Sequence, residues 1–183
     1  MDYRTSKMGE RLTVERLKKI AKMSQTKKNE NVLDVGCGNK AILKYLGAGI
    51  NYIGIDSLDS ADIKYDLGRG LPKLKEKFDL IIISAILEEI ENFKTLIGNC
   101  VKVLKPNGRI IIATPSPNRF LWSEHPVNIH CFRKTNIKNL ATLFGLQIDK
   151  IVGDAIHIPK LNFVIPTNQS FYSNFIIYQL SKK

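Results

Sequence analysis

The segment Asp34-Val35-Gly36-Cys37-Gly38 places an acid and two glycines at the end of a short apolar run. Glycines at such a point let the backbone approach a ligand closely. The free N–H groups of a helix that follows would attract an anionic group such as a carboxylate. The pattern predicts a ligand site, although a tight strand-to-helix turn that binds nothing has the same glycines.

Two cofactors fit these glycines. Gly36-x-Gly38-x-x-Ala41 satisfies the loose dinucleotide fingerprint, with Asp56 about 20 residues downstream. Asp34 argues against a dinucleotide, because a carboxylate beside a pyrophosphate is unfavourable. S-adenosylmethionine (SAM) carries an ammonium and a sulfonium and no phosphate, so the same acid favours it. An NAD-binding oxidoreductase remains the alternative.

The elements that must position this segment alternate between strand and helix patterns. Apolar runs predict strands over residues 31–35, 52–55, 63–65, 78–84, 109–113, 147–152 and 174–180. Helical spacing predicts helices over residues 8–23, 41–46, 93–104 and 134–144, and Pro106-Asn107-Gly108 predicts a turn. This alternation is typical of a doubly wound α/β sheet with right-handed crossovers.

Several segments follow one another in an order known from one enzyme family. They read V-L-D-V-G-C-G at 32–38, Y-I-G-I-D at 52–56, D-L at 66–67, F-D-L-I-I-I-S at 78–84, L-K-P-N-G-R at 104–109, and the helix entry at 132–146. The set resembles the motifs of the class I SAM-dependent methyltransferases, of the small, methyltransferase type 11-like kind. The resemblance implies a Rossmann-like, seven-stranded, mostly parallel sheet with helices on both faces and an antiparallel late strand.

The resemblance also implies roles for residues at the strand ends. Asp56 would accept hydrogen bonds from the ribose hydroxyls, Asp66 and Leu67 would contact the adenine, and Ser84 would lie beside the methionine part. Turn aspartates are the alternative at both acidic positions, above all at Asp66, which precedes Leu67-Gly68. The expected cofactor-binding residues are Asp34, Gly36, Cys37, Gly38, Asp56, Ser57, Asp66, Leu67 and Ser84.

No catalytic residue is assigned by the sequence. Many relatives carry a histidine after the fourth strand at the position that is Glu89 here, so a role that needs an imidazole base there is in doubt. Glu89, His125 and His130 are the candidates for accepting a proton, each with a surface or packing role as its alternative. Clusters of Cys and His at ligand spacing are absent from the sequence, so no metal is expected.

Length and composition restrict the remaining possibilities. With 183 residues and 44% apolar content, residues 1–183 are expected to form a single domain. Its N-terminal helix would lie within residues 1–28, and its substrate-side loops would be residues 114–132 and 154–173. No apolar run is long enough for a membrane span, and the N-terminal residues lack the apolar block of a signal peptide. A cytoplasmic location is expected, and the three widely spaced cysteines predict no disulfide framework.

The net charge of +11 fits either a nucleic-acid partner or a lysine-rich surface. The positive charges are spread along the chain, which favours solvated faces, although a nucleic-acid partner stays open. The predicted reaction is methyl transfer from SAM to a small-molecule acceptor, which leaves S-adenosylhomocysteine. An RNA methyltransferase and a SAM-binding protein without catalysis are the alternatives. The sequence predicts neither the acceptor nor the oligomeric state.

Overall fold

The computed structural model describes residues 7–117, 128–158, 163–170 and 173–183. Their elements, in chain order, are α1 (Lys7–Ser24), β1 (Asn31–Val35), η2 (Ala41–Lys44), β2 (Asn51–Asp56), β3 (Ile63–Lys64), η3 (Leu67–Arg69), β4 (Phe78–Ser84), η4 (Leu87–Glu89), α2 (Phe93–Val103), β5 (Leu104–Pro115), α3 (Lys134–Leu143), β6 (Leu146–Gly153), β7 (Ala155–Ile158), β8 (Phe163–Pro166) and β9 (Phe175–Lys182). The η elements are short 3₁₀ helices. None of the described helices is long and apolar enough to cross a bilayer.

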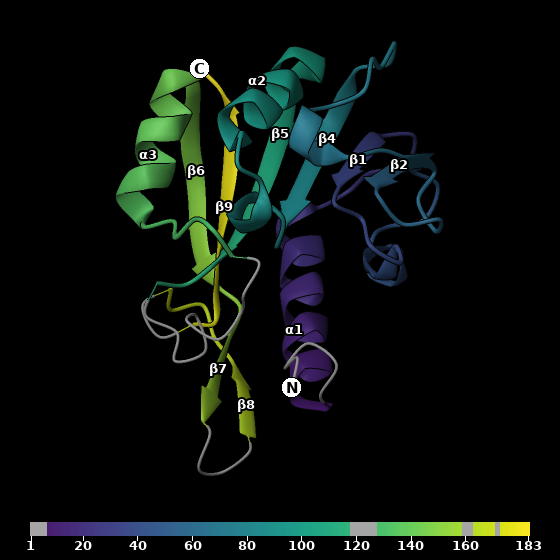
Figure 1. The fold of residues 1–183 in the computed structure, drawn as a ribbon. Coiled ribbons are helices and arrows are strands. Elements are labelled where there is room, and N and C mark those ends of the chain that lie inside the picture. Colours follow the sequence, from purple (N-terminus) through teal and green to yellow (C-terminus); the bar gives the residue numbers. More distant parts are fainter. Residues whose placement is uncertain (1–6, 118–127, 159–162, 171–172) are drawn as a thin grey trace.

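A seven-stranded sheet in the order β3-β2-β1-β4-β5-β9-β6 forms the centre of the fold (Figure 1). Strands β1 to β5 run parallel to one another, whereas β9 is antiparallel to both β5 and β6. The doubly wound α/β prediction, with its antiparallel late strand, is confirmed. The strand order reverses between β1 and β4, and the carboxyl ends of parallel strands at such a reversal are where ligands bind in open α/β sheets.

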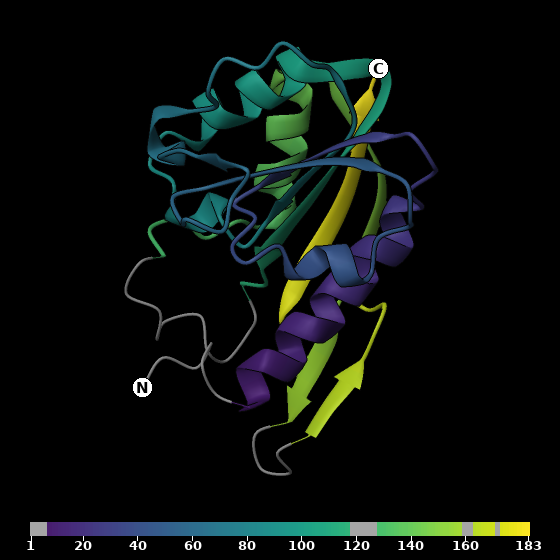
Figure 2. The ribbon, with the colours of Figure 1, turned by 90° about the vertical axis from the view of Figure 1, so that its right-hand side faces the viewer.

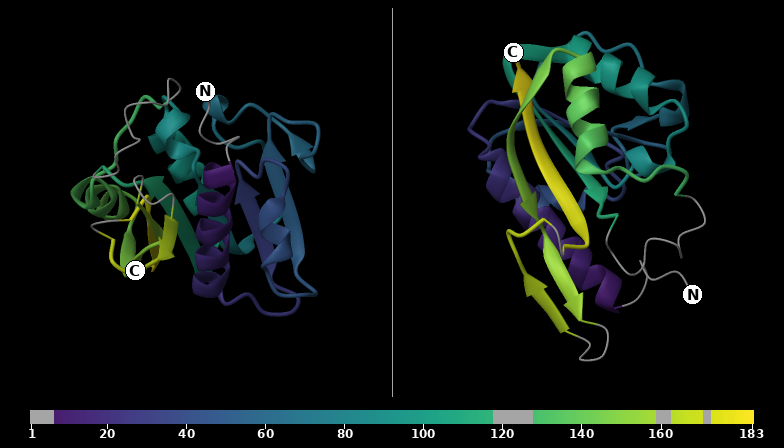
Figure 3. Two further views of the ribbon diagram at one scale, coloured as in Figure 1. Left: turned by 90° about the horizontal axis from the view of Figure 1, so that it is seen from below. Right: turned by 90° about the vertical axis from the view of Figure 1, so that its left-hand side faces the viewer.

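Helices cover both faces of this sheet, as predicted. Helix α1 lies on one face, and α2 and α3 lie on the other (Figures 2 and 3). Strand β4 is buried on both sides: Leu80 and Ile82 pack with α1, and Ile81 and Ile83 pack in the core beneath α2 and α3. Its unbroken apolar run is therefore explained by cover on both faces.

The helix predicted over residues 41–46 is a single 3₁₀ turn, Ala41–Lys44. Lys40, directly before it, has a left-handed backbone with φ of 57°. Gly47 donates its N–H to Thr26 Oγ1 at 2.9 Å, so the chain turns back toward β2 soon after this turn. The prediction of a regular helix, whose N-terminus would offer several free N–H groups, is wrong at this point.

Three further predictions need correction. Strand β5 begins at Leu104, so the predicted Pro-Asn-Gly turn lies inside this strand, where the pairing with β4 shifts register. Gly108 is required there, because a Cβ atom would lie 2.9 Å from the Phe78 carbonyl oxygen. The predicted loop 154–173 contains a hairpin in which β7 pairs with β8. The predicted loop 114–132 begins later than expected, because Thr114 and Pro115 belong to β5, and residues 118–127 lie outside the described part.

Candidate functional site

The glycine loop follows β1 and is fixed against β2. The N–H groups of Gly36 and Cys37 both donate to the Ile55 carbonyl, at 2.9 and 3.1 Å. Gly36 has φ of +79°, and a Cβ atom on it would lie 2.9 Å from Ile86 Cβ. Gly38 has φ of +54°, and a Cβ atom there would meet nothing within 4 Å. The first glycine is therefore needed for close packing, and the second faces open space.

Asp34 lies beneath this loop with only 3% of its surface exposed. The Tyr52 hydroxyl donates to Asp34 Oδ2 at 2.6 Å. Burial raises the pKa of Asp34 to about 6, which the Tyr52 hydrogen bond opposes and the nearby charge of Asp56 reinforces. At neutral pH the carboxylate is therefore mostly charged, and its negative charge favours a cationic ligand at the loop.

Asp56 ends β2 and connects it to the glycine loop. Its Oδ2 accepts a hydrogen bond from the Gly38 N–H at 2.8 Å, and its Oδ1 accepts one from the Leu58 N–H at 3.2 Å. The Ser57 hydroxyl lies 3.4 Å from the same Oδ1 atom. A carboxylate has about four lone-pair sites, so acceptor capacity remains for a ligand.

A cavity of about 480 Å³ opens at the carboxyl ends of β1, β2 and β4, and we call it the loop cavity. It is lined by Thr13, Arg16, Leu17, Asp34, Gly36, Cys37, Gly38, Asn39, Ala41, Ile42, Asp56, Ser57, Leu58, Ile82, Ser84, Ala85, Ile86 and Glu89. The structure thus brings together every predicted cofactor-binding residue except Asp66 and Leu67. The volume of the loop cavity is within the range of about 300–1,000 Å³ that is usual for small-ligand sites.

Asp66 and Leu67 are not among the residues that line this cavity. Asp66 caps η3 by accepting the Gly68 N–H at 2.9 Å, and its exposed carboxylate lies 3.4 Å from the Arg69 guanidinium. Leu67 is buried in the core on the α2 side of the sheet. Both have the geometry of the turn alternative, and their contact with an adenine remains a prediction.

Helix α1 supplies a wall of the cavity that sequence reasoning missed. Thr13, Arg16 and Leu17 line it from this helix. The Arg16 guanidinium lies 4.2 Å from the centre of the Phe175 ring, on the first residue of β9. The only sequence signal for this role is a cation directly beside Leu17 on the apolar face, which is too common to single out Arg16.

The charges around the loop cavity are unequal. Asp34, Asp56 and Glu89 contribute carboxylates, and Arg16 is the only lysine or arginine among its described lining residues. A ligand with two cationic centres and one carboxylate matches this arrangement. A ligand rich in phosphate would face three carboxylates with one guanidinium to offset them. SAM fits the cavity in charge, and the open space at Gly38 gives a ligand access to the backbone.

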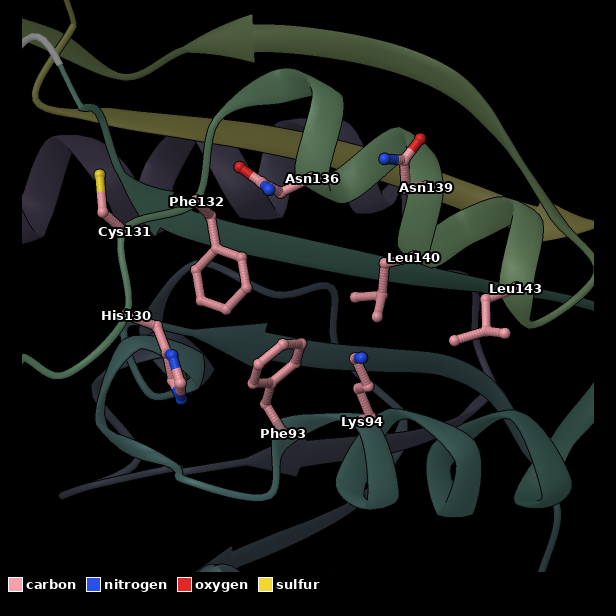
Figure 4. Close-up of a pocket in the computed structure, with 9 residues that line it drawn as sticks. All are labelled: Phe93, Lys94, His130, Cys131, Phe132, Asn136, Asn139, Leu140 and Leu143. Carbon is pink, nitrogen blue, oxygen red and sulfur yellow. The ribbon is translucent and has the colours of Figure 1, made fainter.

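The three catalytic candidates lie in different places. Glu89 ends η4 and lines the loop cavity. His130 instead lines a second cavity, of about 380 Å³, between α2 and α3 (Figure 4). This α2–α3 cavity is formed by Phe93, Lys94, His130, Cys131, Phe132, Asn136, Asn139, Leu140 and Leu143. His130 packs edge-on against Phe93 with ring centres 4.8 Å apart, and His125 lies outside the described residues.

Across the described ranges, no group of three or more His, Cys, Asp or Glu side chains is placed to hold a metal ion. The loop cavity is lined by carboxylates, glycine backbone and one arginine.

Comparison with known families agrees with this geometry. The model of a methyltransferase domain family matches residues 6–151. The chain belongs to this family. It is a class I SAM-dependent methyltransferase, and its sheet topology is the one that the solved members share. The cofactor predicted from Asp34 and the glycines is thereby confirmed as SAM, and the NAD-binding alternative is set aside.

Several individual methyltransferases are similar to this chain in sequence or in fold. The ubiquinone biosynthesis O-methyltransferase of Rickettsia typhi is 34% identical, over 82% of this chain and 75% of the relative. The protein of the same name from Rickettsia canadensis is 27% identical, over 75% and 71%. The solved N-methyltransferase NodS of Bradyrhizobium japonicum, in complex with S-adenosylhomocysteine, has a TM-score of 0.65 at 19% identity, over 98% of this chain and 90% of that one. The match covers only 42% of the human enzyme named ubiquinone biosynthesis O-methyltransferase, mitochondrial.

Proposed function

We propose that this methyltransferase moves the methyl group of SAM to an oxygen atom of a small, partly apolar molecule. The observation that carries the proposal is the charge arrangement of the loop cavity, with three carboxylates and a single arginine. Such a cavity accepts the cationic cofactor and repels a polyanionic acceptor. The O-methyltransferase names of the sequence relatives support oxygen as the methyl-accepting atom.

In this proposal the cofactor is oriented by residues at the strand ends. Asp56 accepts hydrogen bonds from the ribose hydroxyls, and Ser84 and the glycine-loop backbone border the methionine part. Arg16 pairs with the carboxylate of SAM, since its guanidinium is the one described cation on the cavity wall. SAM supplies a methyl group already activated by its sulfonium. The chain's own contribution is alignment and the exclusion of water, which can account for several kcal/mol of the barrier.

Glu89 is the residue that we assign to the acceptor's proton. It lines the loop cavity close in sequence to Ser84, which ends β4, and Ala85 between them has a left-handed φ of 57°. A non-glycine residue with this backbone is strained, and such strain is concentrated at functional sites. A carboxylate there would accept the hydroxyl proton as the methyl group is transferred, an effect of about 10²–10⁴-fold in rate.

The RNA alternative is weaker because of the same charges. RNA binding requires several lysines or arginines near the reacting base to offset the phosphates. The described wall of the loop cavity offers Arg16 alone against Asp34, Asp56 and Glu89. The net charge of +11 is therefore assigned to solvated faces.

The test is methyl transfer from isotopically labelled SAM. The purified protein is incubated with a panel of hydroxylated aromatic compounds with and without apolar substituents, with amines, and with bulk RNA. The expected result is label on oxygen of an apolar hydroxy compound, reduced at least about tenfold in Asp56→Ala at limiting SAM and at least about a hundredfold in Glu89→Gln. Transfer to RNA that falls steeply with salt would replace the proposal with the RNA alternative. Tight SAM binding without transfer to any member of the panel would favour a protein without catalysis.

A further inference from the structure

Asp154, at the junction of β6 and β7, is a buried acid that the proposed mechanism does not use. None of its surface is exposed. Its Oδ1 accepts hydrogen bonds from the N–H groups of Ala155 at 2.6 Å and Phe175 at 2.9 Å. Its Oδ2 accepts none from the described residues. A buried carboxylate with one unsatisfied oxygen is costly, and it persists where a positive charge offsets it.

The positive charge that acts on Asp154 is that of Arg16. Burial raises the pKa of Asp154 to about 6, and this is opposed first by the two backbone N–H groups and then by the Arg16 charge. The same guanidinium lies over the Phe175 ring at 4.2 Å. The Arg16 guanidinium thus lies over an aromatic ring whose own backbone N–H is hydrogen-bonded to the buried Asp154 carboxylate.

Phe175 joins the two contacts into one unit. Its N–H donates to Asp154 Oδ1, its carbonyl accepts the Asp154 N–H at 3.3 Å, and its ring lies under Arg16. The unit is close to the β7–β8 hairpin, because the Asp154 carbonyl accepts the Thr167 N–H at 3.0 Å. Helix α1 lies beside this hairpin in the views of the fold (Figures 1 and 2). Phe175, the first residue of β9, thereby contacts the wall of the loop cavity through Arg16.

We propose that Asp154 is a positioning residue that, together with the Phe175 ring, holds the Arg16 guanidinium in place for the carboxylate of SAM. The inference rests on the proposed role of Arg16. A free arginine side chain has about 2 kcal/mol of rotamer entropy, so fixing it before the ligand arrives favours binding. In this arrangement the charge of Arg16 is attracted by two carboxylates, that of the buried Asp154 and that of the ligand.

The substitution Asp154→Asn separates an effect on the position of Arg16 from an effect on the local fold. The asparagine oxygen still accepts the N–H groups of Ala155 and Phe175, so the turn keeps its hydrogen bonds. What the variant loses is the negative charge that acts on Arg16. A purely structural role for Asp154 predicts no ligand-selective effect from this change.

The experiment is calorimetric titration with two ligands, S-adenosylhomocysteine and decarboxylated S-adenosylmethionine, which lacks the carboxylate. Arg16→Gln is expected to lower the affinity for S-adenosylhomocysteine at least about tenfold. It is expected to lower the affinity for the decarboxylated ligand less than about twofold. Asp154→Asn is expected to lower the affinity for S-adenosylhomocysteine by about three- to tenfold, again with little change in the affinity for the decarboxylated ligand. In the double variant Asp154→Asn adds nothing to Arg16→Gln, because the two residues act on one contact.

Equal weakening of both ligands by Asp154→Asn, or full additivity with Arg16→Gln, would overturn the positioning role. A selective loss in Asp154→Asn with no loss in Arg16→Gln would overturn it as well. The parent protein failing to bind either ligand would instead refute the SAM site itself. If Asp154→Asn does not fold, Phe175→Leu carries the same test, because it removes the ring under the guanidinium and leaves the carboxyl group. Asp149→Asn, at an exposed position of β6, is the control and is expected to change neither affinity.

Discussion

The loop cavity and the α2–α3 cavity differ in chemistry far more than in size, at about 480 and 380 Å³. The first lies at the reversal of strand order and is bordered by glycine backbone, carboxylates and one arginine. The second lies between two helices, where Phe93 and Phe132 pack at right angles with ring centres 5.1 Å apart. Backbone access and charge therefore mark the cofactor site, and the volume of a cavity does not.

The largest effect is expected from a substitution that removes an aromatic ring from the α2–α3 cavity. Phe132 is 4% exposed, so Phe132→Ala is expected to lower the free energy of unfolding by about 3–5 kcal/mol. The affinity for S-adenosylhomocysteine, measured under conditions where the variant is folded, is expected to change less than about twofold. A large affinity loss with little loss of stability would mean that this region belongs to the ligand site.

A methyl group at the first loop glycine is expected to have the next largest effect. Gly36→Ala places a Cβ atom 2.9 Å from Ile86 at a left-handed φ, so a loss of about 10–100-fold in SAM affinity is expected in calorimetry. Gly145→Ala is the matched control, because Gly145 has φ of +65° and open space at its Cβ position. It is expected to cost about 1 kcal/mol of stability and no affinity. Equal affinity losses in the two variants would contradict the role of Gly36.

The acids at two strand ends are expected to differ in the same assay. Asp56→Ala is expected to lose at least tenfold in SAM affinity, about 1.4 kcal/mol, because Asp56 lines the loop cavity. Asp66→Ala is expected to change it less than about twofold, because Asp66 is an exposed cap of η3. A loss in Asp66→Ala as large as in Asp56→Ala would restore the adenine contact predicted from the sequence.

The smallest effect concerns pH. The pKa of Asp34 is raised from 3.8 to about 6 in the folded state, so the folded chain holds its proton more tightly and stability falls as pH rises through about 6. Asp34→Asn removes this penalty and still accepts the Tyr52 hydroxyl. Its stability relative to the parent is expected to rise by about 1 kcal/mol between pH 5 and pH 7.5 in denaturant unfolding, while SAM affinity falls. A constant difference across this range would contradict the raised pKa.

Local patterns predicted the glycine loop and most strands, because each is decided by residues close in sequence. The apolar run of β4 and the acid that ends β2 were predicted without knowledge of distant partners. The 3₁₀ turn Ala41–Lys44 was misjudged, since helical spacing does not show that the chain folds back against Thr26. The β7–β8 hairpin was missed because its strands are short, with four residues each.

The contribution of α1 could not be predicted from local pattern. Arg16 and Phe175 are far apart in sequence and meet only when α1 packs against the start of β9. Asp154 gives no signal in the sequence either, since its burial depends on the junction of three elements. Some of the residues that distinguish this cavity from a plain glycine turn are therefore brought together only by tertiary packing.

The central claim is that the loop cavity selects SAM through its charges. Calorimetric titration of the protein with S-adenosylhomocysteine and, separately, with NAD tests it most directly. The account predicts binding of S-adenosylhomocysteine with a Kd below about 100 μM and no detectable heat with NAD. Binding of NAD without binding of S-adenosylhomocysteine would contradict it.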